Sequence, residues 1–376
     1  MNKQQHASDE ENTPAVSLLL SLEDYARQDE DRADFFASVS IDDNSEGCFT
    51  SADALQNQVE QLNDIDGEAY QKQVITPAES SERYSVLKLI NDITKRIINE
   101  EKDGPLYLAE VELEAGSSFI RVGVVAQNRQ VNNGVWKPEH HQRAVKWLRV
   151  LEAQQMPIVT FIDTPGADAG ADANLTNQAH SISELIATMA DLKVPTVGIV
   201  WGLGYSGGAI PLATTNLLLS VKDGIFSTIQ PKGLASIARK QKLDWQSCAR
   251  LVGVSACELY HEGVLDGVIN YSPLNNTQNS EYIKQSIIHS FEIIEQKSRE
   301  LVHKVRPLAS YYSEESLRFS TGAEVNKSLS PYSVRAYPLI FGFAYKALRS
   351  IKLRSRLKIQ SAQLENANSN DGECLI

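Results

Sequence analysis

The stretch "PTVGIVWGLGYSGGAIPLATTN", from Pro195 to Asn216, decides the fold class of this chain. It opens as a short apolar run, which is typical of a strand buried on both faces of a parallel sheet. Four glycines then follow between Gly202 and Gly208, although each glycine lowers the stability of a helix or a strand. Something other than secondary-structure propensity therefore favours them, such as close packing or a backbone that a ligand must approach.

The segments around this stretch alternate between helical and strand patterns. "PEHHQRAVKWLRVLEAQQ" and "NQAHSISELIATMADLK" have helical spacing, as does "SVLKLINDITKRIINE" (Ser85–Glu100) near the start of the series. Strand patterns occur in "LYLAEVEL", "FIRVGVVA", "PIVTFIDT" and "GVLDGVIN". This alternation predicts an α/β domain with parallel strands and active-site loops at their carboxyl ends.

The composition argues against several classes of protein. The chain has 376 residues and a formal net charge of -12, which is the wrong sign for a general nucleic-acid surface. No apolar run reaches the length of a membrane span, and the N-terminus lacks a signal-peptide core, so we expect a cytoplasmic protein. The four cysteines show no C-x-x-C pairing, which predicts neither a disulfide framework nor a metal site.

Three regions are expected along the chain. Residues 1–76 are rich in acidic and amide side chains and are expected to form a flexible arm, with "LLLSLEDYA" as an alternative docking helix. Residues 77–300 form the α/β domain, and residues 301–376 a helical extension with a flexible tail. The extension carries a basic strip, Lys346–Lys358, which is interpreted as a solvated helix face, a partner for the acidic arm, or an anion-binding strip for a carrier.

Two irregular loops indicate a binding site. "FIDTPGADAG", Phe161–Gly170, and the glycine loop each follow a strand and open a helix, so both can aim peptide N–H groups into one cleft. Such preorganised donors form an oxyanion hole for a carbonyl oxygen that gains negative charge. The alternative is that Gly207 and Gly208 only allow close helix–strand packing. The phosphate-loop pattern G-x-x-x-x-G-K-[ST] is absent, and no His and Asp set accompanies Ser206.

These loops also carry a family resemblance. "MPIVTFIDTPGADAG" resembles "MPIITFIDTPGAYPG" of the carboxyltransferase alpha subunit of bacterial acetyl-CoA carboxylase. The similarity continues without gaps through "LKVPTVGIVWGLGYSGGA" and reaches "IFSTIQPKGLASI" and "GVLDGVIN". It covers Asn132–Asn270 closely and Ser85–Asn128 loosely. The N-terminal arm and the C-terminal tail lie outside it.

The resemblance implies a crotonase-like fold, a spiral of ββα units, and the half-site that receives carboxybiotin. A carboxyltransferase beta-like subunit would supply the acyl-CoA side, and a biotin carboxyl carrier protein the biotin, in a hetero-oligomer. Carried over by position, the donors fall at the backbone of Gly166 or Ala167 and of Gly207 or Gly208. The cofactor-binding positions that the resemblance implies are Gly204, Tyr205, Ser206 and Asp168. In that chemistry biotin's departing ureido anion removes the acyl α-proton, so few acid–base side chains are needed.

Departures from the family pattern indicate a diverged paralogue. Asp168 stands where the family has Tyr, Leu203 and Tyr205 replace Glu and Gly and would intrude on the cleft, and Gln230 opens "QPKG" where the family has "SPEG". Three functions stay open: a carboxyltransferase alpha-like subunit, a biotin-independent decarboxylase of a malonyl thioester on CoA or an acyl carrier protein, and a non-catalytic partner subunit. His140 and His141 are expected to face solvent, and His180 to lie beside the hole.

Overall fold

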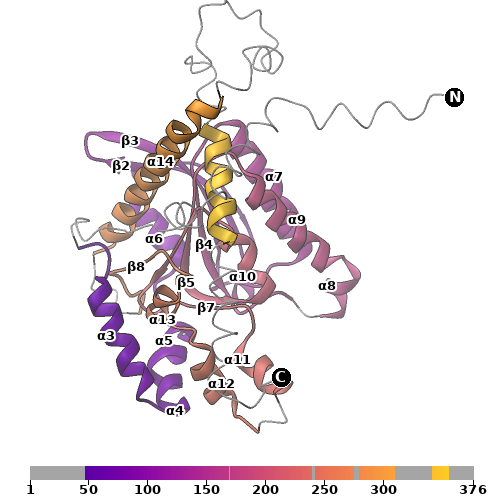
Figure 1. The fold of residues 1–376 in the computed structure, drawn as a ribbon. Coiled ribbons are helices and arrows are strands. Elements are labelled where there is room, and N and C mark those ends of the chain that lie inside the picture. The colour runs from indigo at the N-terminus through magenta and orange to yellow at the C-terminus, as the bar shows by residue number, and fades with distance from the viewer. Residues whose placement is uncertain (1–46, 169, 239–241, 275–278, 310–340, 355–376) are drawn as a thin grey trace, which may run out of the picture.

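The protein is described by a computed structural model that covers residues 47–168, 170–238, 242–274, 279–309 and 341–354 (Figure 1). One eight-stranded sheet runs through it in the order β1-β2-β3-β4-β5-β6-β8, with β7 paired to β5. The strands are β1 (Arg96–Asp103), β2 (Leu106–Ala115), β3 (Ser118–Gln127), β4 (Ile158–Thr164), β5 (Thr196–Tyr205), β6 (Leu217–Val221), β7 (Ile225–Ser227) and β8 (Gly267–Ile269).

The first three strands are antiparallel, and the later pairs in the sheet are parallel. β5 divides its partners along its length, because Val197–Val200 pairs with β6 and Leu203–Tyr205 pairs with β7. The predicted α/β class is therefore confirmed. The helices that follow the N-terminal segment are α6 (Val86–Ile93), η2 (Asn132–Gly134), α7 (Pro138–Ala153), α8 (Ala171–Leu175), α9 (Gln178–Asp191), α10 (Ser206–Ala213), α11 (Pro231–Ile237), α12 (Trp245–Val252), α13 (Ala256–His261) and α14 (Glu281–Ala309).

Helices cover both faces of the sheet and build one apolar core on each. α7, α9 and α10 pack on one face, through residues such as Leu148 and Leu185. α6 and α14 pack on the other, with Leu89 and Ile287 among the buried residues. Figure 1 shows α7 beside α9 and, on the other side of the sheet, α14 crossing over it. β4 and β5 lie between the two layers and are buried along their whole length, which accounts for their unbroken apolar runs.

The N-terminal segment differs from the expected flexible arm over its second part. Helices α3 (Ala52–Asn63), α4 (Gly67–Tyr70), η1 (Gln71–Ile75) and α5 (Thr76–Glu79) pack against the domain. Leu55, Leu62, Tyr70 and Ile75 are buried in the same core as β4 and β5. The acidic and amide residues that suggested disorder occupy the outer faces, while the sparse apolar residues are enough for one buried stripe per helix. Residues 1–46 lie outside the described part of the chain.

Polar contacts also hold the N-terminal helices on the domain, in addition to the apolar packing. The Tyr70 hydroxyl donates to Glu258 on α13 at 2.5 Å and accepts from the Val254 amide at 2.9 Å. α4 approaches α12 so closely that a methyl group on Gly67 would lie 2.7 Å from the Ser247 nitrogen. The domain therefore includes residues from 52 onward, although the expected boundary was residue 77.

Residues 341–354 form a helix that lies beside α14, drawn in yellow in Figure 1. Three of the four described basic residues of the strip, Lys346, Arg349 and Lys352, face the domain, whereas Arg354 is exposed. Arg349 is fully buried and donates to the carbonyls of Leu192 and Val194 at 2.7 and 2.8 Å. Lys346 pairs with Asp191 at 2.5 Å, and Lys352 pairs with Asp266. These residues anchor the helix, so the solvated-face and carrier interpretations do not hold for them.

Within the described residues, no helix is long and apolar enough to cross a membrane.

Candidate active site

The two predicted loops leave neighbouring strands at the same edge of the sheet. β4 ends at Thr164, which pairs with Gly204 near the end of β5. The β4 loop continues through Pro165–Ala167, and β5 passes directly into α10 at Ser206. Because β4 and β5 are parallel, their carboxyl ends open on one side of the sheet.

The loops also touch each other. A methyl group added to Gly208 would lie 2.5 Å from the carbonyl carbon of Gly166 and 2.9 Å from the nitrogen of Ala167. Only glycine allows α10 to approach the Gly166–Ala167 peptide this closely. Gly207 has more room, because its added methyl group would meet only the Ile182 side chain, at 3.5 Å. The structure therefore brings the four predicted hole residues together, and the packing explanation applies to Gly208.

The hydrogen bonds narrow the choice of donors. The Gly166 N–H donates to Thr164 Oγ1 at 3.3 Å, so it is already used inside its loop. Among the described residues, no acceptor bonds the Ala167 N–H. The first turn of α10 has no side-chain cap, and Ser206 and Gly207 are half-buried, whereas Gly208 is buried. The N–H groups of Ala167 and Gly207 are thus the best candidates for an oxyanion hole.

Ser206 stands at a sharp turn between strand and helix. Its φ of 57° is in the left-handed region, which is uncommon for residues other than glycine. The letters Gly204-Tyr205-Ser206-Gly207-Gly208 also fit G-x-S-x-G, the spacing of a nucleophile elbow. No histidine or carboxylate of the described chain is hydrogen-bonded to its hydroxyl. The turn therefore displays backbone N–H groups without the base that a serine nucleophile needs.

The other cofactor-binding candidates are already engaged in packing or in contacts within their own loop. Gly204 packs under Phe226, because an added methyl group would lie 2.6 Å from its ring. Leu203 and Tyr205 are 4% and 3% exposed and belong to the core that includes the N-terminal helices, so both side chains pack inward and do not project from the loop as expected. The Asp168 carboxylate accepts the Gly170 N–H at 2.8 Å and so turns back onto its own loop.

Two glutamines that sequence reasoning gave no role hold the loops in place. Gln127, the last residue of β3, donates to the Gly208 carbonyl at 2.9 Å and accepts the Asp163 N–H at 3.1 Å. Gln230 donates to the Pro165 carbonyl. The only sequence signal for Gln127 was a polar residue that closes an apolar strand. Gln230 was visible as a departure from the family pattern, without an indication of what it contacts.

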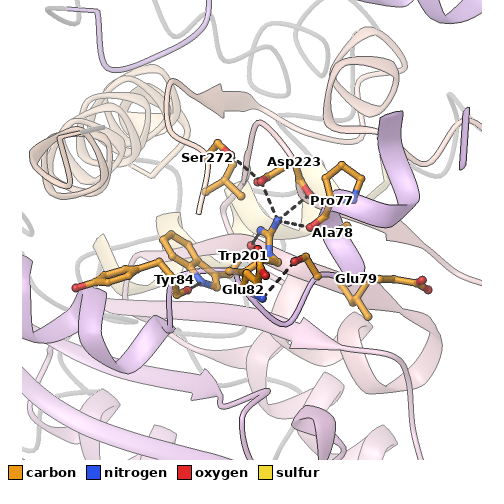
Figure 2. Close-up of polar contacts among 12 residues, drawn as sticks. Pro77, Ala78, Glu79, Glu82, Tyr84, Trp201, Asp223 and Ser272 are labelled. Atoms are coloured by element: carbon orange, nitrogen blue, oxygen red, sulfur yellow. Dashed lines mark hydrogen bonds and ion pairs between the residues drawn. The ribbon is translucent and has the colours of Figure 1, made fainter. Parts of the chain in front are cut away.

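A polar network built on Arg83 and Arg129 lies near Asp163, in β4. Arg83 pairs with Asp223 at 2.9 Å and donates to the carbonyls of Pro77 and Trp201 (Figure 2). Arg129 donates to the carbonyls of Ala78 and Glu79 at 2.6 and 2.7 Å. These bonds attach the end of α5 to β5 and to the loop after β3.

A cavity of about 480 Å³ lies next to this network. It is lined by the α5–α6 link, the loop after β3, and Asp163 at the end of β4. Asp163 is buried, and desolvation raises the pKa of its carboxyl group, although Arg129 lies 3.7 Å away and the Leu203 N–H donates to it at 3.0 Å.

His140 and His141 differ from the prediction that they face solvent. His140 and His141 are 7% and 1% exposed, because the first turn of α7 is covered by neighbouring segments. His141 lies 3.0 Å from Ser181 Oγ, and burial lowers its pKa to about 4. His180 is exposed on α9. Within the described residues, no group of three or more His, Cys, Asp or Glu could hold a metal ion.

The family model for acetyl co-enzyme A carboxylase carboxyltransferase-like proteins matches residues 122–309. The chain belongs to this family. This match confirms the resemblance seen in the sequence, and the sheet described above confirms the α/β class. The match begins inside β3 and includes both loops.

Curated relatives carry the same family name. The chain is 34% identical over 183 residues to the acetyl-coenzyme A carboxylase carboxyl transferase subunit alpha of Syntrophomonas wolfei, covering 47% of this chain and 58% of that protein. It is 34% identical to the subunit of Staphylococcus haemolyticus over 44% of this chain and 54% of that protein. The chain thus spans somewhat more than half the length of these relatives. Among solved structures, the transcarboxylase 12S hexamer is 14% identical with a TM-score of 0.47, covering 62% of this chain and 44% of that one.

Proposed function

We propose that this chain is a carboxyltransferase alpha-like subunit. It would act with a beta-like partner to transfer a carboxyl group from carboxybiotin to an acyl thioester such as acetyl-CoA. The relatives' names place them as alpha subunits of acetyl-coenzyme A carboxylase, and family membership supports the same class of reaction here. A biotin carboxyl carrier protein would deliver the biotin.

The observation that carries this proposal is the contact between Gly208 and the Gly166–Ala167 peptide. This contact supports a hole in which the N–H groups of Ala167 and Gly207 stabilise an oxygen that gains negative charge. Loss of one such donor typically costs about 2.7–4 kcal/mol in the transition state. The chain's contribution is then positioning and charge stabilisation, which needs no catalytic base among the loop side chains.

The residues present fit a planar acceptor group. Gly207 carries no Cβ, Ala167 carries only a methyl group, and α10 opens without a side-chain cap, so backbone donors stay accessible. Carboxybiotin, when bound, would supply the carboxyl group. Asp168 is a poor anchor for an anionic group, and its bond to Gly170 keeps the carboxylate directed at its own loop.

The reverse reaction provides the test. The purified chain and its beta-like subunit are incubated with malonyl-CoA, with and without biocytin, and acetyl-CoA formation is followed. The proposal predicts formation that depends on biocytin and on both subunits. Acetyl-CoA formation without biocytin would contradict the carboxyltransferase proposal and indicate a malonyl-thioester decarboxylase. No formation under either condition, from a complex shown to assemble, would leave a non-catalytic partner subunit.

A further inference from the structure

We propose that Gln127 is the positioning residue that sets the distance between the two loops of the hole. The proposal rests on the proposed function for its catalytic consequence, but the geometry stands on contacts alone. Gln127 is completely buried and lies at the end of β3, next to β4. Its side-chain amide bonds both loop-bearing elements at once, one with each end.

Each end of the amide has a distinct partner. Nε2 donates to the Gly208 carbonyl at 2.9 Å, within the first turn of α10. Oε1 accepts the Asp163 N–H at 3.1 Å, three residues before Gly166. A primary amide suits this task because it carries a donor and an acceptor on one rigid plane. Gln127 therefore acts as a spacer between the end of β4 and the start of α10.

Backbone pairing between β4 and β5 does not fix the position of Asp163. The register between β4 and β5 shifts between Ile162 and Thr164, so Asp163 has no Cα partner on β5. Its N–H is satisfied by Gln127, and its carboxylate accepts the Leu203 N–H at 3.0 Å. Side chains therefore hold the β4 end in the segment that leads into the hole. A buried N–H without an acceptor is costly, so the arrangement in which Gln127 accepts the Asp163 N–H is favoured over others.

The catalytic consequence follows from the distance sensitivity of preorganised donors. Without the Gln127 amide, no side chain in the described part of the chain links the start of α10 to the end of β4, so the distance between the two loops can increase. The absence of a side chain at Gly208 permits their contact but does not enforce it. A misplacement of about 1 Å in an active site can lower the rate about 100-fold. Because Gln127 touches neither candidate donor directly, it is expected to change kcat of the malonyl-CoA reaction more than KM.

The direct test is amide hydrogen exchange of the full chain carrying Gln127→Met, which keeps the length of the side chain but removes both bonds. The expected result is at least tenfold faster exchange in segments 163–168 and 206–213 than in the wild type. Gln127→Asn is a second variant, because it retains the amide but is one methylene too short to reach both partners. It should also speed exchange in both segments, and it keeps the test decisive if Gln127→Met does not fold.

Thr196→Val is the matched control, at the amino end of β5 and therefore at the opposite end of that strand from the two loops. Its hydroxyl is also buried and joins two elements, since it accepts the Asn216 N–H at 3.0 Å and the Arg349 Nε–H at 3.2 Å. This variant should lose comparable stability without faster exchange at the hole. Folded Gln127 variants with wild-type exchange in both segments would overturn the proposal.

In the assembled complex, Gln127→Met is expected to lower kcat about 10- to 100-fold. An inactive wild-type complex would count against the proposed function while leaving the exchange result as the test of the spacer. An active wild-type complex whose kcat survives a variant with faster exchange would show that the spacing does not govern turnover.

Discussion

At the residue scale, Gly207 and Gly208 look alike in the sequence but have different surroundings. A methyl group on Gly208 would press on the Gly166–Ala167 backbone, whereas one on Gly207 has ordinary contact with Ile182. Gly208→Ala is therefore expected to lower the free energy of unfolding by about 1–3 kcal/mol. Gly207→Ala should leave the free energy of unfolding unchanged or raise it slightly, because the methyl group has room and alanine forms helices better than glycine. Urea unfolding of both variants checks this, and equal losses would contradict the close approach of the two loops at Gly208.

His141 links stability to pH. Burial lowers its pKa to about 4 in the folded chain, below the ordinary value of 6.5. The neutral ring is thus favoured by folding, so this contribution is fully present above pH 6.5 and is lost as the pH falls toward 4. The shift corresponds to about 3 kcal/mol. His141→Gln should flatten the fall of unfolding free energy between pH 6.5 and 4, and an unchanged slope would show that other groups cause it.

At the scale of elements, the helix of residues 341–354 is held by a buried cation. Arg349 donates to three backbone carbonyls and to Asn216 Oδ1, and burial lowers its pKa to about 9. Arg349→Met removes these bonds and leaves buried acceptors without donors, at about 1–3 kcal/mol per acceptor. Thermal unfolding should show a clear loss of Tm, whereas Lys88→Met, at an exposed position on α6, should change it little. Similar losses for both would contradict the anchoring role.

The sequence predicted some elements better than others for physical reasons. The strands around "PIVTFIDT" and "PTVGIVWG" were predictable because burial on both faces leaves an uninterrupted apolar run. The helix expected over Ser85–Glu100 ends at Ile93, and Arg96–Asp103 forms β1. Ile97 fitted the helical spacing, but it pairs with Val111 on β2, a contact between distant segments that local periodicity does not encode. The same limit hid Gln127, whose partners lie 36 and 81 positions away.

At the scale of the whole molecule, the domain begins earlier than composition suggests. The helices between Ala52 and Glu79 bury at least six apolar side chains in the core that also contains Leu203 and Tyr205. Burying one such side chain contributes about 1.5–3 kcal/mol, so their joint loss is comparable with the ~5–15 kcal/mol stability of a whole domain. Removing residues 1–76 should therefore prevent stable folding. Removing residues 1–46 is predicted to leave Tm nearly unchanged, and equal behaviour of the two truncations would contradict this boundary.

Under the proposed function, main-chain donors, and not a side-chain nucleophile, serve the reaction of the assembled complex. The most direct test is the kcat of Ser206→Ala in the complex with the beta-like subunit, followed by biocytin-dependent formation of acetyl-CoA from malonyl-CoA. Because Ser206 has left-handed backbone geometry, Ser206→Gly serves as the control for altered backbone strain. We predict that both variants keep kcat within about threefold of the wild type, since loss of a catalytic group costs far more. A loss of about 100-fold or more in both folded variants would contradict the role of the main-chain donors and assign the reaction to the serine hydroxyl.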